Sequence, residues 1–249
     1  MRINKQVLVV LFISLLALGA NGSTANITKE SIISNAKKRT YYLFVPKQIK
    51  APAPLILLLH GSGHYGLSLV EKWRELAEEK GFIVAGPDSS DSSAWSAPQD
   101  GPEFLQDLIE ALKQRCSINP RRVYLFGHSA GASFGLQMSL FESQYFAAIA
   151  VHAGALTEKA YPIIDFAAAR RKIPIAIFSG TEDRSVPITM VRATRDQLRK
   201  RDFPIEVVEM PHHDHWYYDL APKINRDCWE FLQRYELGED PKYEQIHFR

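Results

Sequence analysis

The chain alternates short, almost wholly apolar runs with longer amphipathic stretches. Runs such as 53–61 (APLILLLHG) and 173–180 (IPIAIFSG) have the composition of strands that are buried on both faces. Stretches such as 67–81 carry apolar residues at helical spacing and stop at a glycine. We expect strands over 39–46, 53–61, 82–89, 121–127, 146–154, 173–180 and 204–211, and helices over 67–81, 102–116, 130–142, 188–202 and 220–237. This alternation predicts an α/β fold, a mostly parallel sheet with helices on both faces.

The first 22 residues differ in kind from the rest. Arg2 and Lys5 precede an apolar run over 7–18, and small residues follow it, which is the pattern of a secretory signal peptide. The run is shorter than the roughly 20 residues that a membrane-spanning helix needs, although an uncleaved anchor stays open as the alternative. We therefore expect a signal peptide over 1–22, one domain over 27–249, a secreted or periplasmic location and no stable membrane insertion after cleavage.

Composition excludes some partners. The formal net charge is +2, and no basic stretch is interleaved with aromatic residues, so we expect no nucleic-acid partner. An exported protein could oxidise its two cysteines, Cys116 and Cys228, to a disulfide. Their helices are expected on opposite faces of the sheet, which favours two separate thiols, while pairing stays open. The sequence does not predict the oligomeric state.

The strongest chemical signal is Ser129 within GHSAG at 127–131, where a predicted strand gives way to a predicted helix. Ligands of parallel sheets bind at the carboxyl ends of the strands. A sharp strand-to-helix turn exposes the serine hydroxyl, and glycines two residues before and after it relieve the crowding. We interpret Ser129 as a nucleophile, with a small residue at a tight turn as the alternative.

A second strand end carries HGSG at 60–63. A serine nucleophile needs two N–H donors for the oxyanion, and in this architecture they come from an early loop and from the residue after the serine. We expect the backbone N–H groups of Ser62 and Ala130 to form this oxyanion hole. His60 is expected to support the loop rather than to transfer a proton.

Two later strand ends supply an acid and a base. Asp183 follows the strand at 173–180 and is the expected partner of a histidine, with Glu182 and Asp165 as rivals. Three histidines lie close together after the last strand, and His215 is the expected base, ahead of His213 and His212. The familiar zinc spacings are absent, so we expect neither a metal nor another cofactor.

The order Ser, Asp, His along the chain is that of the triad in α/β-hydrolases. With LLLHGSG, RRVYLFGHSAGA, FSGTEDRSVP and HDHWYYDLAPKINRDCWEFL, the chain resembles the α/β-hydrolase superfamily, and more narrowly the secreted esterase group of polyhydroxybutyrate depolymerases, feruloyl esterases and acetylxylan esterases. The resemblance implies an α/β-hydrolase fold without a large lid, and ester hydrolysis through an acyl-enzyme on Ser129. The implied substrate is a small or polymer-linked ester, such as an acyl or feruloyl group on a polysaccharide, or a polyester.

Three aromatic residues, Trp95, Trp216 and Tyr217, are candidates for lining a substrate cleft, with ordinary packing as the alternative. Other functions stay open. A peptidase of the prolyl-oligopeptidase type shares the triad, and an acyltransferase differs only in the accepting nucleophile. A non-catalytic binding module on the same fold is the alternative from another class.

Overall fold

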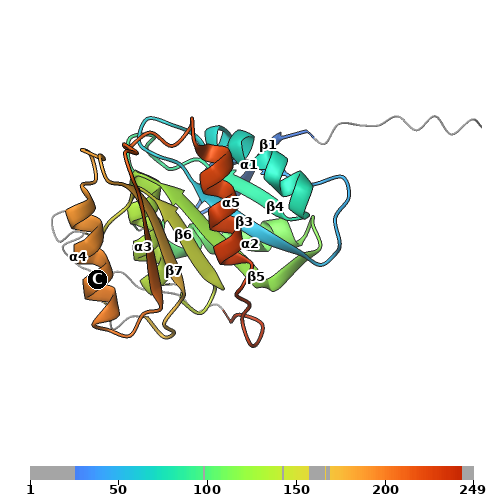
Figure 1. Cartoon of the computed structure of the whole chain (residues 1–249). Helices are drawn as coiled ribbons and strands as arrows, with labels where there is room; N and C mark the ends of the chain where they lie inside the picture. The colour runs from blue at the N-terminus through green and yellow to red at the C-terminus, as the bar shows by residue number, and fades with distance from the viewer. Residues whose placement is uncertain (1–25, 98, 142, 157–165, 167–168, 243–249) are drawn as a thin grey trace, which may run out of the picture.

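In a computed structural model, the chain forms an α/β fold around one sheet (Figure 1). The structure describes residues 26–97, 99–141, 143–156, 166 and 169–242. The strands are β1 (Thr28–Ser34), β2 (Lys37–Phe44), β3 (Ala53–Leu59), β4 (Ile83–Pro87), β5 (Ile118–His128), β6 (Ala148–His152), β7 (Ile175–Gly180) and β8 (Ile205–Met210). The helices are α1 (Gly66–Lys80), α2 (Pro102–Lys113), α3 (Ala130–Phe141), α4 (Ile188–Arg199) and α5 (Ala221–Leu232).

The described strands make one eight-stranded sheet in the order β1-β2-β4-β3-β5-β6-β7-β8. Strands β3 to β8 pair in parallel, whereas β2 pairs antiparallel with both β1 and β4. Every residue of β3 is buried, because this strand lies inside the sheet and under helices on both faces. The parallel strands bring the carboxyl ends of β3, β5, β6 and β7 to one edge.

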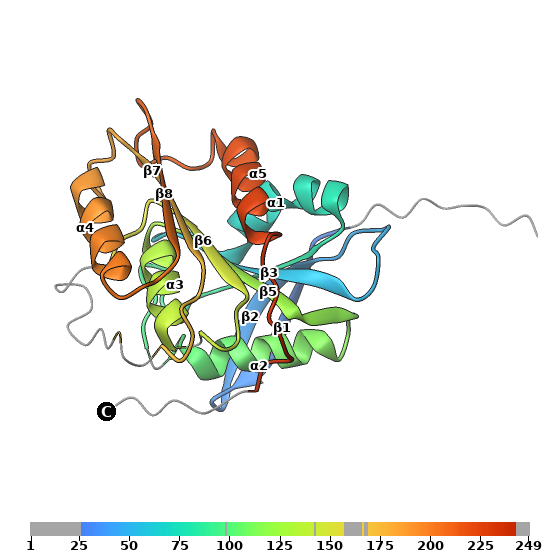
Figure 2. The ribbon, with the colours of Figure 1, turned by 60° about the horizontal axis from the view of Figure 1, so that its bottom comes forward.

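Helices cover both faces of the sheet (Figure 2). The buried side chains of α1 and α5 pack into one core cluster, and those of α2, α3 and α4 pack into a second cluster on the opposite face. Helix α3 is apolar on nearly all sides, as a helix buried among neighbours should be. The described residues contain no large lid insertion, so the predicted fold class is confirmed.

The sequence reading missed β1. Its residues are mostly exposed, because it lies at the edge of the sheet and pairs only with β2. The hairpin turn uses Asn35 and Ala36, both at positive φ (49° and 57°), and the absence of a glycine there weakens the usual turn signal. The predicted elements are present, and most of their ends lie within a few residues of the expected ones.

The two cysteines are free and lie on opposite faces of the sheet. Cys116 is half-buried and packs against the core cluster formed with α2, α3 and α4. Cys228 on α5 is fully buried in the cluster on the opposite face of the sheet. The expectation of two separate thiols is therefore confirmed. None of the described helices is long and apolar enough to cross a membrane. The expected signal peptide lies outside the described residues.

The loop between β4 and α2 is organised around one buried carboxylate. Asp100, which is 0% exposed, accepts hydrogen bonds from the guanidinium of Arg39 at 2.6 Å and from the N–H groups of Ser90 (2.8 Å) and Ser96 (2.9 Å). The Arg39 guanidinium also lies 3.5 Å from the ring centroid of Phe104 on α2. Strand β2, the loop and α2 are thereby joined at one point.

This loop in turn supports the segment after β3. Trp95 lies within it and donates its indole N–H to the carbonyl oxygen of His60 at 2.8 Å. The N–H of Gly63 donates to the carbonyl of Ser92 at 2.8 Å. The buried ion pair between Arg39 and Asp100 therefore helps to hold the loop that follows β3.

We predict that Asp100→Asn lowers the free energy of unfolding by about 3–5 kcal/mol, because it leaves the buried Arg39 guanidinium without its counter-charge. Urea denaturation followed by circular dichroism measures this change. The matched control is Glu209→Gln, which removes one carboxylate from the exposed pair with Arg192 and should leave the unfolding midpoint nearly unchanged. Equal effects of the two substitutions would contradict the proposed role of Asp100.

Candidate active site

Ser129 occupies a strained turn between β5 and α3. Its φ is +54°, in the left-handed region that residues with a side chain rarely adopt. A Cβ atom added to Gly131 would lie 2.1 Å from the carbonyl oxygen of Leu59, and one added to Gly127 would lie 2.4 Å from that of Gly131. Both positions therefore require glycine. The turn has the geometry that presents a serine hydroxyl at the carboxyl edge of the sheet.

Ser129, His215 and Asp183 form one hydrogen-bonded relay. The Oγ of Ser129 lies 2.8 Å from Nε2 of His215, and Nδ1 of His215 lies 2.8 Å from Oδ2 of Asp183. The other carboxylate oxygen accepts the N–H groups of Ser185 and Val186, each at 2.8 Å. When Nδ1–H of His215 donates to the carboxylate, Nε2 is free to accept the proton of Ser129. The structure thus brings together the three residues that the sequence predicted.

The rival acids and bases lie elsewhere. Glu182 contacts His212, with its carboxylate 3.0 Å from Nδ1, and both side chains are largely exposed. His213 turns inward, and its Nε2 lies 3.0 Å from Nε2 of His152. None of these three residues has a hydrogen bond to Ser129. Asp165, the remaining rival, lies outside the described residues.

The two expected oxyanion donors are backbone N–H groups without an acceptor among the described residues. Ala130 is the first residue of α3, so its N–H has no acceptor within the helix. The loop after β3 runs close to the nucleophile, since a Cβ on Gly61 would lie 3.4 Å from Cβ of Ser129. Among the described residues, the N–H of Ser62 in this loop has no acceptor. The expected oxyanion donors are therefore present, and their role stays a prediction.

His60 is buried and supports the loops around it. Its Nδ1 lies 2.8 Å from the carbonyl oxygen of Gly61, and its Nε2 accepts the N–H of Ser89 at 3.2 Å. Burial lowers the pKa of its imidazole, which favours the neutral ring. The structure places it as expected, with no hydrogen bond to the relay.

Two of the three predicted cleft aromatics are buried, and those predictions are wrong. Tyr217 is 0% exposed and donates its hydroxyl to the side-chain oxygen of Asn225. Trp95 is 6% exposed and stacks on Phe134, with ring centroids 5.5 Å apart. Both rings face the core, where they fill space between the sheet and its helices. Trp216, in contrast, is 48% exposed, beside His215.

Sequence analysis missed other aromatic residues near the site. The ring of His64 lies 4.9 Å from that of Tyr218 and 6.3 Å from that of Trp216, measured between centroids. Tyr65, next along the chain, is 56% exposed. We call His64, Tyr65, Trp216 and Tyr218 the aromatic rim. The sequence feature that could have identified the rim is the pair His64 and Tyr65, which directly follows HGSG.

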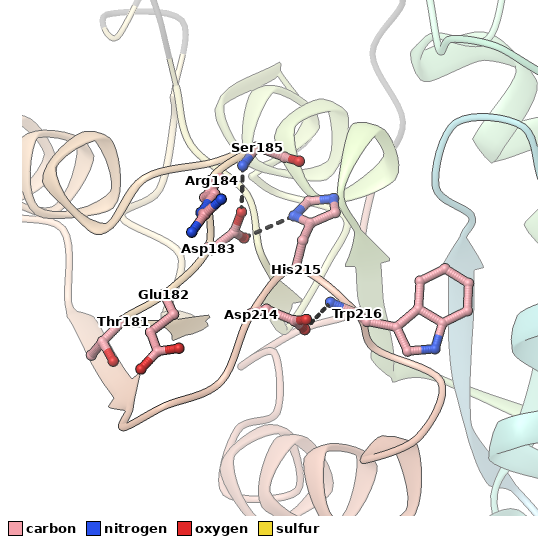
Figure 3. Close-up of a pocket in the computed structure, with 8 residues that line it drawn as sticks. All are labelled: Thr181, Glu182, Asp183, Arg184, Ser185, Asp214, His215 and Trp216. Carbon is pink, nitrogen blue, oxygen red and sulfur yellow. Dashed lines mark hydrogen bonds and ion pairs between the residues drawn. The ribbon is translucent and has the colours of Figure 1, made fainter.

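An open depression of about 810 Å³ lies beside the acid and the base (Figure 3). It is lined by residues 181–185 and 214–216, and Ser129 is not part of its lining. Figure 3 shows His215 facing Asp183, while the ring of Trp216 points away from this carboxylate. Within the described ranges, no group of three or more acidic, histidine or cysteine side chains is arranged to hold a metal ion.

Proteins with named esterase activities are similar in sequence to part of this chain. A bifunctional acetylxylan esterase/xylanase of Neocallimastix patriciarum is 27% identical over 150 residues, which are 58% of this chain and 21% of that protein. Esterase FrsA of Yersinia pestis is 26% identical over 121 residues, or 47% of this chain and 29% of that protein. The chain thus spans less than a third of the length of either relative.

Solved structures share the fold. An S-formylglutathione hydrolase from Agrobacterium tumefaciens superposes with a TM-score of 0.67 at 19% identity, over 85% of this chain and 95% of that one. Est1E from Butyrivibrio proteoclasticus superposes with a TM-score of 0.62 at 16% identity, over 83% of this chain and 98% of that one. At these identities, the likeness concerns the fold alone.

The family assignment rests on the sequence that surrounds the relay. The sequence pattern of the phospholipase/carboxylesterase family matches residues 87–226, more than half of the chain. This range contains Ser129, Asp183 and His215 and most of the parallel sheet. The expected resemblance to esterases of the α/β-hydrolase type is confirmed, and the chain belongs to the phospholipase/carboxylesterase family.

Proposed function

We propose that this protein is a serine carboxylesterase that forms an acyl-enzyme on Ser129. The observation that carries the proposal is the relay, with both of its hydrogen bonds at 2.8 Å. His215 accepts the proton of Ser129 as Oγ attacks the ester carbonyl carbon. Asp183 keeps the imidazole in the useful tautomer and stabilises its cationic form.

This attack forms a tetrahedral oxyanion, which collapses to the acyl-enzyme, and the acyl-enzyme is then hydrolysed. The alcohol leaves with the proton held by His215, and the acyl group stays on Ser129. A water molecule next attacks the acyl carbon and gives its proton to His215, after which the acid leaves and Ser129 regains its proton. The N–H groups of Ser62 and Ala130 stabilise the oxyanion in both steps, and such a donor typically contributes about 3–4 kcal/mol.

The aromatic rim supports a substrate class. Trp216, which follows the base in the chain, and Tyr65 are exposed and provide flat apolar surfaces, which stack on phenyl rings and on the apolar faces of sugars. Among the expected substrates, the rim favours feruloyl esters and acyl groups on polysaccharides over polyesters. The acetylxylan activity in the name of the relative from Neocallimastix patriciarum supports the same choice.

The relay predicts that Ser129→Ala lowers kcat for a short-chain aryl ester by about 10⁶-fold, because no other group supplies the nucleophile. Asp183→Asn should lower kcat by about 10⁴-fold, since it stabilises the wrong tautomer of His215. Initial rates with 4-nitrophenyl acetate measure both effects.

Matched controls use the same residue types outside the relay. Glu182→Gln and His212→Ala alter the exposed pair that neighbours the relay in sequence, and both should keep near-native kcat. A larger loss with Glu182→Gln than with Asp183→Asn would show that the acid is misassigned. Circular dichroism confirms that each variant is folded.

For the rim, we predict that Trp216→Ala raises KM for methyl ferulate about three- to tenfold, because a stacking contact is lost. KM for vinyl acetate, which has no ring, should change little. Ile33→Ala is the control, since it removes an exposed apolar side chain from β1, at the far edge of the sheet. Equal KM changes for both esters would argue against a ring-binding role.

We also propose export, on the basis of the charged start and apolar run within residues 1–22. When the full chain is produced in a host with a secretory pathway, mass spectrometry of the exported protein should find a new N-terminus between about residues 19 and 25. Exclusive recovery of chains that begin at Met1 from the cytoplasm would contradict the proposal.

A further inference from the structure

Three histidines outside the relay form a continuous chain beneath it. Nδ1 of His152 lies 3.1 Å from Nδ1 of His128, and Nε2 of His152 lies 3.0 Å from Nε2 of His213. Their exposed fractions are 0% for His152, 4% for His128 and 8% for His213. The proposed reaction uses none of these rings for proton transfer.

The two ends of this imidazole chain adjoin the two reacting residues. His128 is the last residue of β5 and directly precedes Ser129, and His213 lies two residues before His215. The middle ring belongs to His152, which pairs with His128 in the sheet and ends β6. The chain therefore connects the turn that carries the nucleophile to the loop that carries the base.

Backbone contacts leave this loop little freedom at His213. Its carbonyl oxygen accepts the N–H of Glu182 at 2.9 Å, beside the acid of the relay. A Cβ on Gly180 would lie 2.0 Å from the same oxygen, so the loop packs directly on the end of β7. The side chain of His213 adds an anchor on the other side of β7, at the end of β6.

Hydrogen bonding couples the protonation of the three rings. Each bond joins two ring nitrogens, so one of them carries the proton and the other offers a lone pair. In the neutral chain, His152 donates through one nitrogen and accepts through the other, so one tautomer determines the other two. Burial lowers the pKa of His152 to about 2 and that of His128 to about 3, and it also lowers the pKa of His213. The rings are therefore neutral near pH 7.

The surroundings of the chain favour this neutral state. The ring of His215 lies 5.4 Å from that of His128 between centroids, and His215 becomes a cation during the proposed reaction. Tyr217 stacks on His128 at 5.2 Å between centroids. The carboxylates of Asp183 and Asp214 favour the cationic form of His213, but burial outweighs them, and His215 opposes a cation at His128. A second cation in the chain would oppose proton uptake by His215.

We propose that His128, His152 and His213 are positioning residues, a neutral imidazole chain that holds the loop of His215 in register with Ser129. The inference rests on the proposed function, because the held distance is the one between the nucleophile and its base. Loss of the middle ring should therefore affect the chemical step more than substrate binding. A displacement of about 1 Å between reacting groups can lower the rate about 10²-fold.

The test replaces His152 with phenylalanine, which keeps a ring of similar size and removes both hydrogen bonds. We expect His152→Phe to lower kcat for 4-nitrophenyl acetate by about 10- to 100-fold while KM changes by less than about twofold. Active-site titration normalises kcat to the folded fraction. A variant with native kcat, or with a change in KM alone, would overturn the proposal.

Two controls separate positioning from general loss of stability. Ile149→Ala removes packing from the same strand on the other face of the sheet, and Ser179→Ala removes a buried hydroxyl with no partner among the described residues at the end of β7. Both variants should keep kcat within about twofold of native. A loss with Ile149→Ala as large as that with His152→Phe would also overturn the proposal.

A second measurement needs neither activity nor a variant. In the wild-type protein with ¹⁵N-labelled histidine, NMR should show that the assigned rings of His128, His152 and His213 are neutral near pH 7, each with one protonated nitrogen. The rings of His128 and His152 should stay neutral down to about pH 5.5. Titration of these rings near pH 6.5 would contradict the chain, even if His152→Phe fails to fold. A wild-type protein without esterase activity would refute the proposed function, whereas the NMR result would still decide on the imidazole chain.

Discussion

The close approach of backbones at the turn around Ser129 is the constraint on which the rest of the site depends. Gly131 packs against the carbonyl oxygen of Leu59, at the end of β3, and Gly127 packs against Gly131. These contacts leave no room for side chains, so β5, α3 and the loop after β3 come together at one point. The same contacts accompany the positive φ of Ser129 and bring the loop that carries Ser62 close to it. The same glycine contacts thus position Ser129 and the two proposed oxyanion donors.

The acid and the base depend on a second packing point, at the end of β7. Asp183 is held by two backbone N–H groups and by His215, so its carboxylate is buried with both oxygens satisfied. The loop of His215 lies against Gly180 and meets the loop of Asp183 through backbone hydrogen bonds. A base on a loop would lose precision if the loop moved freely. Here it is held from two sides, by the strand end below it and, through His213, by the imidazole of His152.

Sequence predicted the features that follow from local pattern and chain order. Continuous apolar runs identified the buried strands, and polar residues directly after them identified Ser129, Asp183 and His215. Side-chain direction within irregular segments was not predictable in this way. Trp216 and Tyr217 are neighbours in one loop, yet one is exposed and the other is buried, because tertiary packing rather than periodicity decides their direction. The contact between His152 and His213 was equally hidden, since it joins residues 61 positions apart in the chain.

The reacting residues and the aromatic rim differ in how firmly the fold constrains them, and this difference bears on substrate specificity. Ser129 directly follows a strand, and Asp183 and His215 lie on loops that pack against a strand end, where close backbone packing allows few substitutions without strain. The aromatic rim lies in the loop before α1 and in the segment before α5, where Trp216 and Tyr65 are exposed and contribute little to the core. Under the proposed function, changes in the rim alter which ester binds while the relay keeps its geometry.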